Sequence, residues 1–195
     1  MAELNRDFPI YGIAFDGVIA ATDELASQWL KNKRGLTVPS HMIAGEYLIR
    51  LIGKDSYDRM SAEVYGDSTP QAEPIHWVAG TLLSLSLNNN LYVVTTRPPE
   101  RKRAAGIWLA EYDLLDLFVD LLGTKDHDIP NDTKLAICQR YGMKAMVDND
   151  PRHLVGEVHD DFTKVLLKEG STEDIETSDG VILARNWDEV LVALE

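Results

Sequence analysis

The sequence contains almost no cysteine. Cys138 is the one cysteine among 195 residues, so a disulfide within the chain is impossible and a reducing compartment is expected. Cys138 falls inside a predicted helix, where burial in the core is its expected role. Residues 1–7 also lack the apolar run of a signal peptide. Together these features predict a cytoplasmic protein.

Basic residues are scarce too. The chain has 19 Lys and Arg residues against 32 Asp and Glu residues, which gives a net charge of −13. Such a surface repels polyanions, so we expect no extended nucleic acid as a partner. A small phosphate in a locally basic pocket remains compatible with this charge. No apolar run is long enough to span a membrane, and we expect no membrane partner. The oligomeric state stays unknown at this point.

Three short apolar segments are each followed by polar side chains. Residues 10–15 precede Asp16-Gly17, residues 91–95 precede Thr96-Arg97, and residues 143–147 precede Asp148-Asn149-Asp150. Short apolar runs bounded by turn residues are typical of strands buried in a parallel sheet. Open α/β sheets bind ligands at the carboxyl ends of such strands. Each ending alone is also typical of a simple turn, but three together favour a common site.

Helical segments separate the predicted strands. This alternation predicts an α/β protein with a parallel sheet and right-handed crossovers. Residues 22–70 read as helices inserted between the first two strands, with Asp23 as the expected cap of the first helix. Strands are predicted at residues 10–15, 91–95, 117–122, 143–147, 164–167 and 181–183, and helices at 22–34, 39–51, 55–65, 74–87, 99–112, 132–141 and 187–194.

The strand endings, in this order, resemble the haloacid dehalogenase (HAD) superfamily of phosphohydrolases. Within it, the likeness is closest to the 5'(3')-deoxyribonucleotidase group. The family pattern Asp-x-Asp-Gly-Val corresponds to residues 14–18, Thr-x-Arg-Pro to residues 95–98, the family lysine to Lys134, and Asp-Asp to Asp148-Asn149. The resemblance implies the HAD fold, a Rossmann-like parallel sheet flanked by helices with a small helical cap. It divides the chain into a core, residues 1–21 and 71–195, and a cap, residues 22–70.

The resemblance also implies a covalent mechanism. An aspartate attacks phosphorus, and a second aspartate, at the position of Asp16, transfers the proton. Mg²⁺ and a lysine neutralise the charge of the transition state. The ligand is expected to be a small phosphorylated metabolite or a nucleotide. The implied phosphate-binding residues are Thr95, Thr96, Arg97 and Lys134, and the implied Mg²⁺ ligands are Asp16, Asp148, Asn149 and Asp150. Lys125 and Lys144 are rivals for the role of Lys134.

One departure from the family dominates the functional prediction. Ala14 stands at the position of the attacking aspartate, and its methyl group can neither attack phosphorus nor bind metal. We therefore predict that the chain forms no aspartyl-phosphate. Asn149, where the family often has aspartate, weakens the expected metal site by one charge, for which Asp150 could compensate.

Three functions remain open, whether Ala14 arose naturally or by engineering. The chain is a phosphohydrolase scaffold that needs an aspartate at position 14, a non-catalytic protein that binds a phosphate or nucleotide, or a partner-binding protein with a vestigial pocket. Cap aromatics such as Tyr57 and Tyr65 either stack on a base or form the core of the cap.

Overall fold

Six parallel strands form one sheet in the computed structural model, which describes residues 1–124, 133–172 and 174–195. Their spatial order is β3-β2-β1-β4-β5-β6, so the strand that comes first in the sequence lies in the middle of the sheet. This arrangement confirms the predicted α/β class. The strands are β1 (Ile10–Ala14), β2 (Asn90–Thr95), β3 (Phe118–Gly123), β4 (Ala145–Asp148), β5 (Thr163–Leu167) and β6 (Val181–Ala184).

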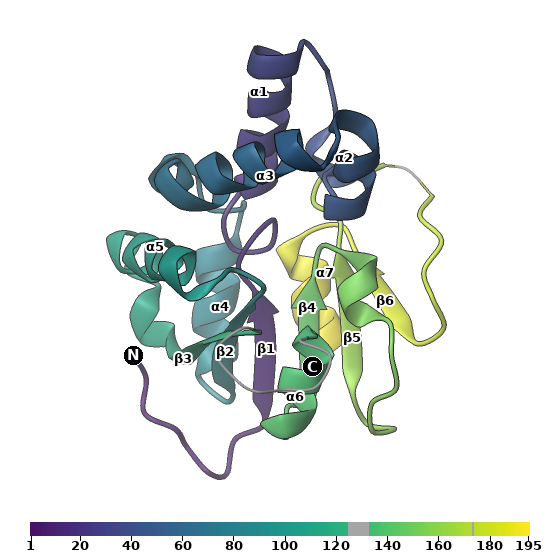
Figure 1. The fold of residues 1–195 in the computed structure, drawn as a ribbon. Helices are drawn as coiled ribbons and strands as arrows, with labels where there is room; N and C mark the ends of the chain where they lie inside the picture. Colours follow the sequence, from purple (N-terminus) through teal and green to yellow (C-terminus); the bar gives the residue numbers. More distant parts are fainter. Residues whose placement is uncertain (125–132, 173) are drawn as a thin grey trace.

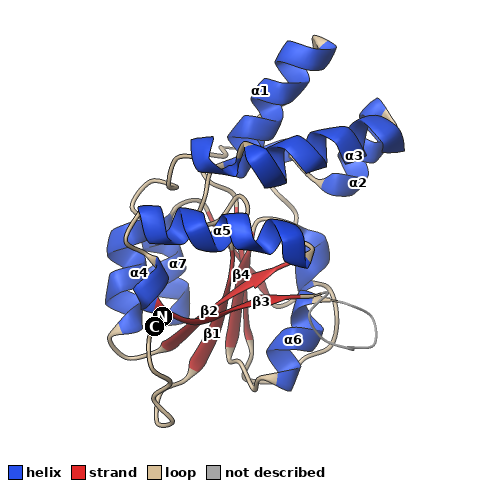
Figure 2. Cartoon of the chain, turned by 60° about the vertical axis from the view of Figure 1, so that its left-hand side comes forward, coloured by secondary structure: helices blue, strands red, loops and turns tan. Residues whose placement is uncertain are grey.

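Helices cover both faces of the sheet. Figure 2 shows α4 (Val78–Ser86) and α7 (Trp187–Leu194) on one side of the strands and α6 (Lys134–Arg140) on the other. Helix α5 (Pro99–Glu111) follows β2 and precedes β3 in the sequence. Cys138 is buried within α6, as predicted. Strands such as β2, which is buried along its whole length, read as continuous apolar runs because helices cover both of their faces.

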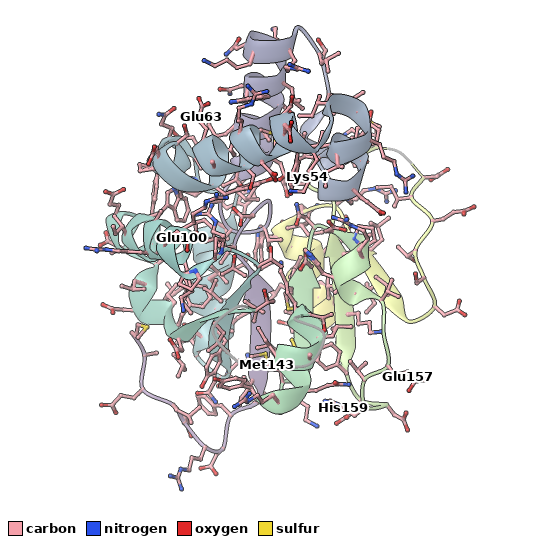
Figure 3. All side chains as sticks on the ribbon, in the orientation of Figure 1. Lys54, Glu63, Glu100, Met143, Glu157 and His159 are labelled. Carbon is pink, nitrogen blue, oxygen red and sulfur yellow. The ribbon has the colours of Figure 1, made fainter. Side chains whose placement is uncertain are left out.

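The helices of residues 22–70 lie above the carboxyl ends of the strands (Figure 1). They include α1 (Thr22–Arg34), α2 (Gly45–Ile52) and α3 (Lys54–Ala62). Eight buried side chains give these helices a separate hydrophobic core, which contains Leu30, Leu48 and Met60. In Figure 3, Lys54 and Glu63 mark this part of the molecule, while Met143 and His159 mark the opposite end.

The two connections between cap and core run side by side. The Ala21 amide donates to the Glu73 carbonyl at 2.9 Å, and Ala20 bridges to Pro74. The indole of Trp108, on α5, donates to the Ala72 carbonyl at 2.8 Å. These contacts fix the position of the cap relative to the sheet.

Some predicted helices have different bounds. The helix expected at residues 39–51 is interrupted, because Ile43 and Ala44 are extended between a short 3-10 turn and α2. The helix expected from residue 74 begins at Val78, because Trp77 has a left-handed backbone. The remaining single turns are η1 (Ser40–Met42), η2 (Glu63–Asp67), η3 (Thr69–Gln71), η4 (Leu115–Leu117) and η5 (Pro151–Leu154).

Two further expectations concern helix caps and membrane spans. Asp23 does not cap α1, because the helix begins at Thr22 and its N-cap Ala21 makes no side-chain bond. Thr133 caps α6 by accepting from the Ala136 amide. In the part of the chain that the structure describes, every helix is too short or too polar to cross a membrane.

The core of the cap yields a stability prediction. Met60 is fully buried, and Met60→Ala leaves a cavity, so we expect it to lower the free energy of unfolding by about 2 to 5 kcal/mol in urea titrations. Leu83→Ala, on an exposed position of α4, is the matched control and should cost less than about 1 kcal/mol. Equal effects of the two variants would contradict a packed cap core.

Candidate functional site

A cavity of about 220 Å³ lies between the cap and the carboxyl ends of the strands. We call this cavity the pocket. Six of the predicted site residues line the pocket. The three others, Ala14, Thr95 and Asp148, are not among its lining residues. The six predicted lining residues are Asp16, Thr96, Arg97, Lys134, Asn149 and Asp150, and further lining residues include Asp23, Tyr57, Tyr65, Arg101, Arg152 and His153.

A tight turn places Asp16 at the wall of the pocket. Gly17 has a backbone φ of +66°, and a Cβ atom there would lie 2.1 Å from Nδ2 of Asn149. Only glycine fits such a position, since it has no side chain and adopts positive φ freely. The indole of Trp187 donates to the Val18 carbonyl at 3.0 Å and holds the turn from the side of α7.

Ala14 is completely buried at the end of β1. It pairs in register with Val94 of the neighbouring strand. Its backbone is therefore positioned by the sheet, and its side chain brings no oxygen to the site. The attacking aspartate of the resembled family therefore has no counterpart at position 14.

The Asp16 carboxylate accepts two hydrogen bonds from one side of the Arg97 guanidinium. Nη2 of Arg97 donates to Oδ1 of Asp16 at 2.7 Å, and Nε donates to Oδ2 at 3.0 Å. This bidentate geometry is the strongest that arginine forms with a carboxylate. The Thr95 hydroxyl accepts from the Arg97 amide at 3.1 Å, so it stabilises the turn that carries the arginine. Of the adjacent threonines, Thr96 reaches the pocket and Thr95 does not.

Lys134 and Asp148 form a buried ion pair. Nζ of Lys134 lies 2.7 Å from Oδ2 of Asp148, whose side chain is fully buried. Nδ1 of His153 lies 3.1 Å from the same oxygen. Burial opposes ionisation of Asp148, but Lys134 and His153 outweigh it and hold the pKa of this carboxyl well below its usual range. The structure therefore places Lys134 at the site, whereas Lys144 pairs with exposed Asp161, and Lys125 lies outside the described residues.

Asp150 and Asn149 bind other side chains of the protein. Asp150 forms a bidentate ion pair with Arg152, including a 2.9 Å contact from Nε to Oδ1. Burial raises the pKa of Asp150, and the hydrogen bonds from Arg152 more than reverse this, so the net shift is downward. The Asn149 amide donates to Oδ2 of Asp23 at 2.6 Å.

Asp23 is a site residue that sequence reasoning missed. Burial first, and then the nearby carboxylate of Asp16, raise its pKa to about 8. At neutral pH this carboxyl group therefore holds a proton. Arg101, Arg152 and His153 were missed as well, because charged residues in a helix or turn usually face solvent. Tyr57 and Tyr65 line the pocket and also pack against the core of the cap. The guanidinium carbon of Arg97 lies 5.7 Å from the centre of the Tyr65 ring.

The residues present do not fit the predicted Mg²⁺ site. Mg²⁺ needs carboxylate or carbonyl oxygens in near-octahedral geometry. Asp16, Asp148 and Asp150 each accept from a cationic side chain of the protein instead. Among the residues that the structure describes, no group of three or more His, Cys, Asp or Glu side chains is arranged to hold a metal ion.

Solved structures with the same architecture are HAD-like hydrolases and phosphatases. One is a putative phosphoglycolate phosphatase from Lactobacillus plantarum, with a TM-score of 0.66 and 9% identity over 95% of this chain and 99% of that one. Another is a putative HAD-hydrolase from Bacillus subtilis bound to magnesium, with a TM-score of 0.61 and 12% identity over 97% and 99% of the two chains. A third is a HAD-like hydrolase from Streptococcus pneumoniae, with a TM-score of 0.59 and 12% identity over 98% and 100%.

These similarities establish the fold. The chain has the α/β, Rossmann-like HAD fold, as the strand endings predicted. No protein-family model matches the sequence, and no curated protein matches it. At such low identity the likeness concerns the fold, so the chemistry has to be argued from the residues.

The buried pair of Lys134 and Asp148 yields a second prediction. Lys134→Met leaves a buried carboxylate without its main partner, and we expect it to lower the free energy of unfolding by about 3 to 5 kcal/mol. Adding Asp148→Asn removes the stranded charge and should recover at least about 1 kcal/mol. Lys144→Met, in an exposed pair, is the control and should cost less than about 1 kcal/mol. A double variant less stable than Lys134→Met would contradict the pairing.

Asp23 yields a prediction on pH dependence. Its pKa is about 8 in the fold against 3.8 for a free side chain, so between these values the unfolded chain loses this proton and the folded chain keeps it. Asp23 therefore lowers stability progressively as pH rises through this interval. Asp23→Asn removes the effect, so the variant should gain at least about 1 kcal/mol over the unaltered protein between about pH 5 and pH 8. The control is Asp7→Asn on an exposed loop, and a pH-independent difference for Asp23→Asn would refute the shift.

Proposed function

We propose that this chain is a HAD-superfamily protein that binds a small phosphorylated metabolite in the pocket without hydrolysing it. The observation that carries the proposal is the charge balance of the lining. Four Lys and Arg side chains line the pocket against three Asp side chains, one of which, Asp23, is protonated at neutral pH. The chain as a whole has a net charge of −13, so the pocket departs in sign from the rest of the molecule.

Arg101 is the lining cation best placed to meet an anion. Its Nη1 donates to the Ser61 hydroxyl at 3.1 Å. Within the described part of the chain, no carboxylate forms an ion pair with Arg101. The other lining cations already have acidic partners. An incoming phosphate would therefore gain a charge-assisted contact that no group of the protein now makes.

The lack of hydrolysis follows from two features. Ala14 supplies no attacking oxygen, and Asp16, in the acid/base position, is engaged at both oxygens by Arg97. A carboxylate that is bound at both oxygens is less available to a substrate or a water molecule than a free one. Replacing Ala14 by Asp restores the missing nucleophile but leaves the second obstacle in place.

The size of the pocket favours a metabolite over a nucleotide. Sites for drug-sized ligands commonly occupy about 300 to 1,000 Å³. The pocket, at about 220 Å³, suits a smaller molecule. Two similar solved structures are described as phosphoglycolate phosphatases, which makes 2-phosphoglycolate a reasonable first probe.

The test combines binding and turnover. We expect 2-phosphoglycolate to bind in calorimetric titrations, and Arg101→Gln to weaken binding by about tenfold or more because it removes one charge-assisted contact. Arg103→Gln, on an exposed position of the same helix, is the matched control and should bind normally. Phosphate release should stay at background for both the unaltered chain and Ala14→Asp.

Two outcomes would contradict the proposal in different ways. Strong Mg²⁺-dependent hydrolysis by Ala14→Asp would identify a phosphohydrolase scaffold that lacks one side chain. Absence of both binding and hydrolysis would favour a protein that binds another macromolecule through its surface.

A further inference from the structure

The contacts of Arg97 limit which cations the site accepts. Besides Asp16, the guanidinium donates from Nη1 to the Thr69 hydroxyl at 3.0 Å, and its carbon lies 4.8 Å from the centre of the Phe15 ring. The Arg97 side chain is 3% exposed. The arginine is thus enclosed by β1, by the end of β2 and by the cap.

Thr69 completes this enclosure. It is fully buried, and its hydroxyl donates to the Val64 carbonyl at 3.3 Å while it accepts from Arg97. Both hydrogen-bonding roles of this hydroxyl are therefore used. Arg97 thus forms hydrogen bonds with both Asp16 and Thr69, so several contacts together hold the guanidinium in place.

A divalent cation at Asp16 would compete with Arg97, which already donates to both carboxylate oxygens. If the cation displaced Arg97, the guanidinium would stay buried without a carboxylate, which is strongly unfavourable for a charged group. The three other carboxyl groups near the pocket are also engaged, since Asp148 is held by Lys134 and Asp150 by Arg152. Asp23 accepts from the Asn149 amide at 2.6 Å, and burial raises its pKa to about 8. Arginine and lysine side chains therefore already balance the charges of the ionised carboxylates at this edge of the sheet.

We propose that the pocket binds a compact phosphate-class anion without Mg²⁺, with Arg97 fixed beside Asp16 where a metal ion would otherwise bind. This inference rests on the proposed binding function and adds the nature of the cations. Arg101 and Lys134 line the same pocket as Arg97, and Arg101 offers the anion the contact that no carboxylate now makes. The ligand is a free phosphate or a small phosphomonoester, and its binding needs no metal ion.

The first experiment measures anion binding with and without metal. Inorganic phosphate and 2-phosphoglycolate are titrated calorimetrically into the full chain in EDTA and again in excess Mg²⁺. We expect dissociation constants that agree within about twofold in the two buffers. Binding that is about tenfold or more tighter in Mg²⁺ would overturn this inference and leave the proposed function intact. Binding in neither buffer would overturn both.

The second experiment measures metal binding without any anion. Mn²⁺, which shares the oxygen ligands of Mg²⁺, is titrated into the chain and the free ion is followed by electron paramagnetic resonance. We expect no stoichiometric site in the unaltered protein, and one bound Mn²⁺ per chain would overturn the inference. Arg97→Met exposes Asp16 and should raise Mn²⁺ affinity, with Arg103→Met as the control. If Arg97→Met fails to fold, the titration of the unaltered protein still decides.

Discussion

The ion pair between Asp16 and Arg97 is the contact on which the rest of the site depends. It joins the turn after β1 to the turn after β2, two segments that are far apart in the sequence and adjacent in the sheet. Through Thr69 the same arginine reaches the end of the cap. One guanidinium therefore connects the two strand ends with each other and with the cap.

The same principle recurs along the edge of the sheet. Asp148 is paired with Lys134 and lies within hydrogen-bond distance of His153, and Asp150 is paired with Arg152. Buried charges are tolerated only when paired, which is the physical reason for these contacts. A fold carries a site without dictating its reaction, so the proposed function rests on these pairs and not on the HAD architecture. What remains in the pocket is an excess of positive charge and a small volume.

Much of the fold could be predicted from the sequence, because apolar runs such as residues 91–95 and the residues that follow them are local signals. The same signals placed Asp16 and Arg97 at one edge, since the ends of parallel strands converge, while Lys134 was selected through the resemblance to the HAD superfamily. The pairing within the site could not be predicted, because whether Arg97 faces a ligand or Asp16 depends on a turn geometry that no periodicity encodes. Asp23 was missed for a related reason: its position at the start of a helix suggested a cap, while burial and the nearby Asp16 carboxylate raise its pKa.

The central claim is that Arg97 holds Asp16 permanently, and the side-chain Nε–H resonance of Arg97 tests it most directly. In nitrogen-edited NMR spectra, an Nε–H group in a buried bidentate pair is protected from exchange, and Arg97→Lys assigns its signal. The account predicts one protected signal that keeps its position and intensity when millimolar Mg²⁺ is added. A signal that exchanges rapidly with water, or that shifts on addition of Mg²⁺ in step with metal binding, would contradict it.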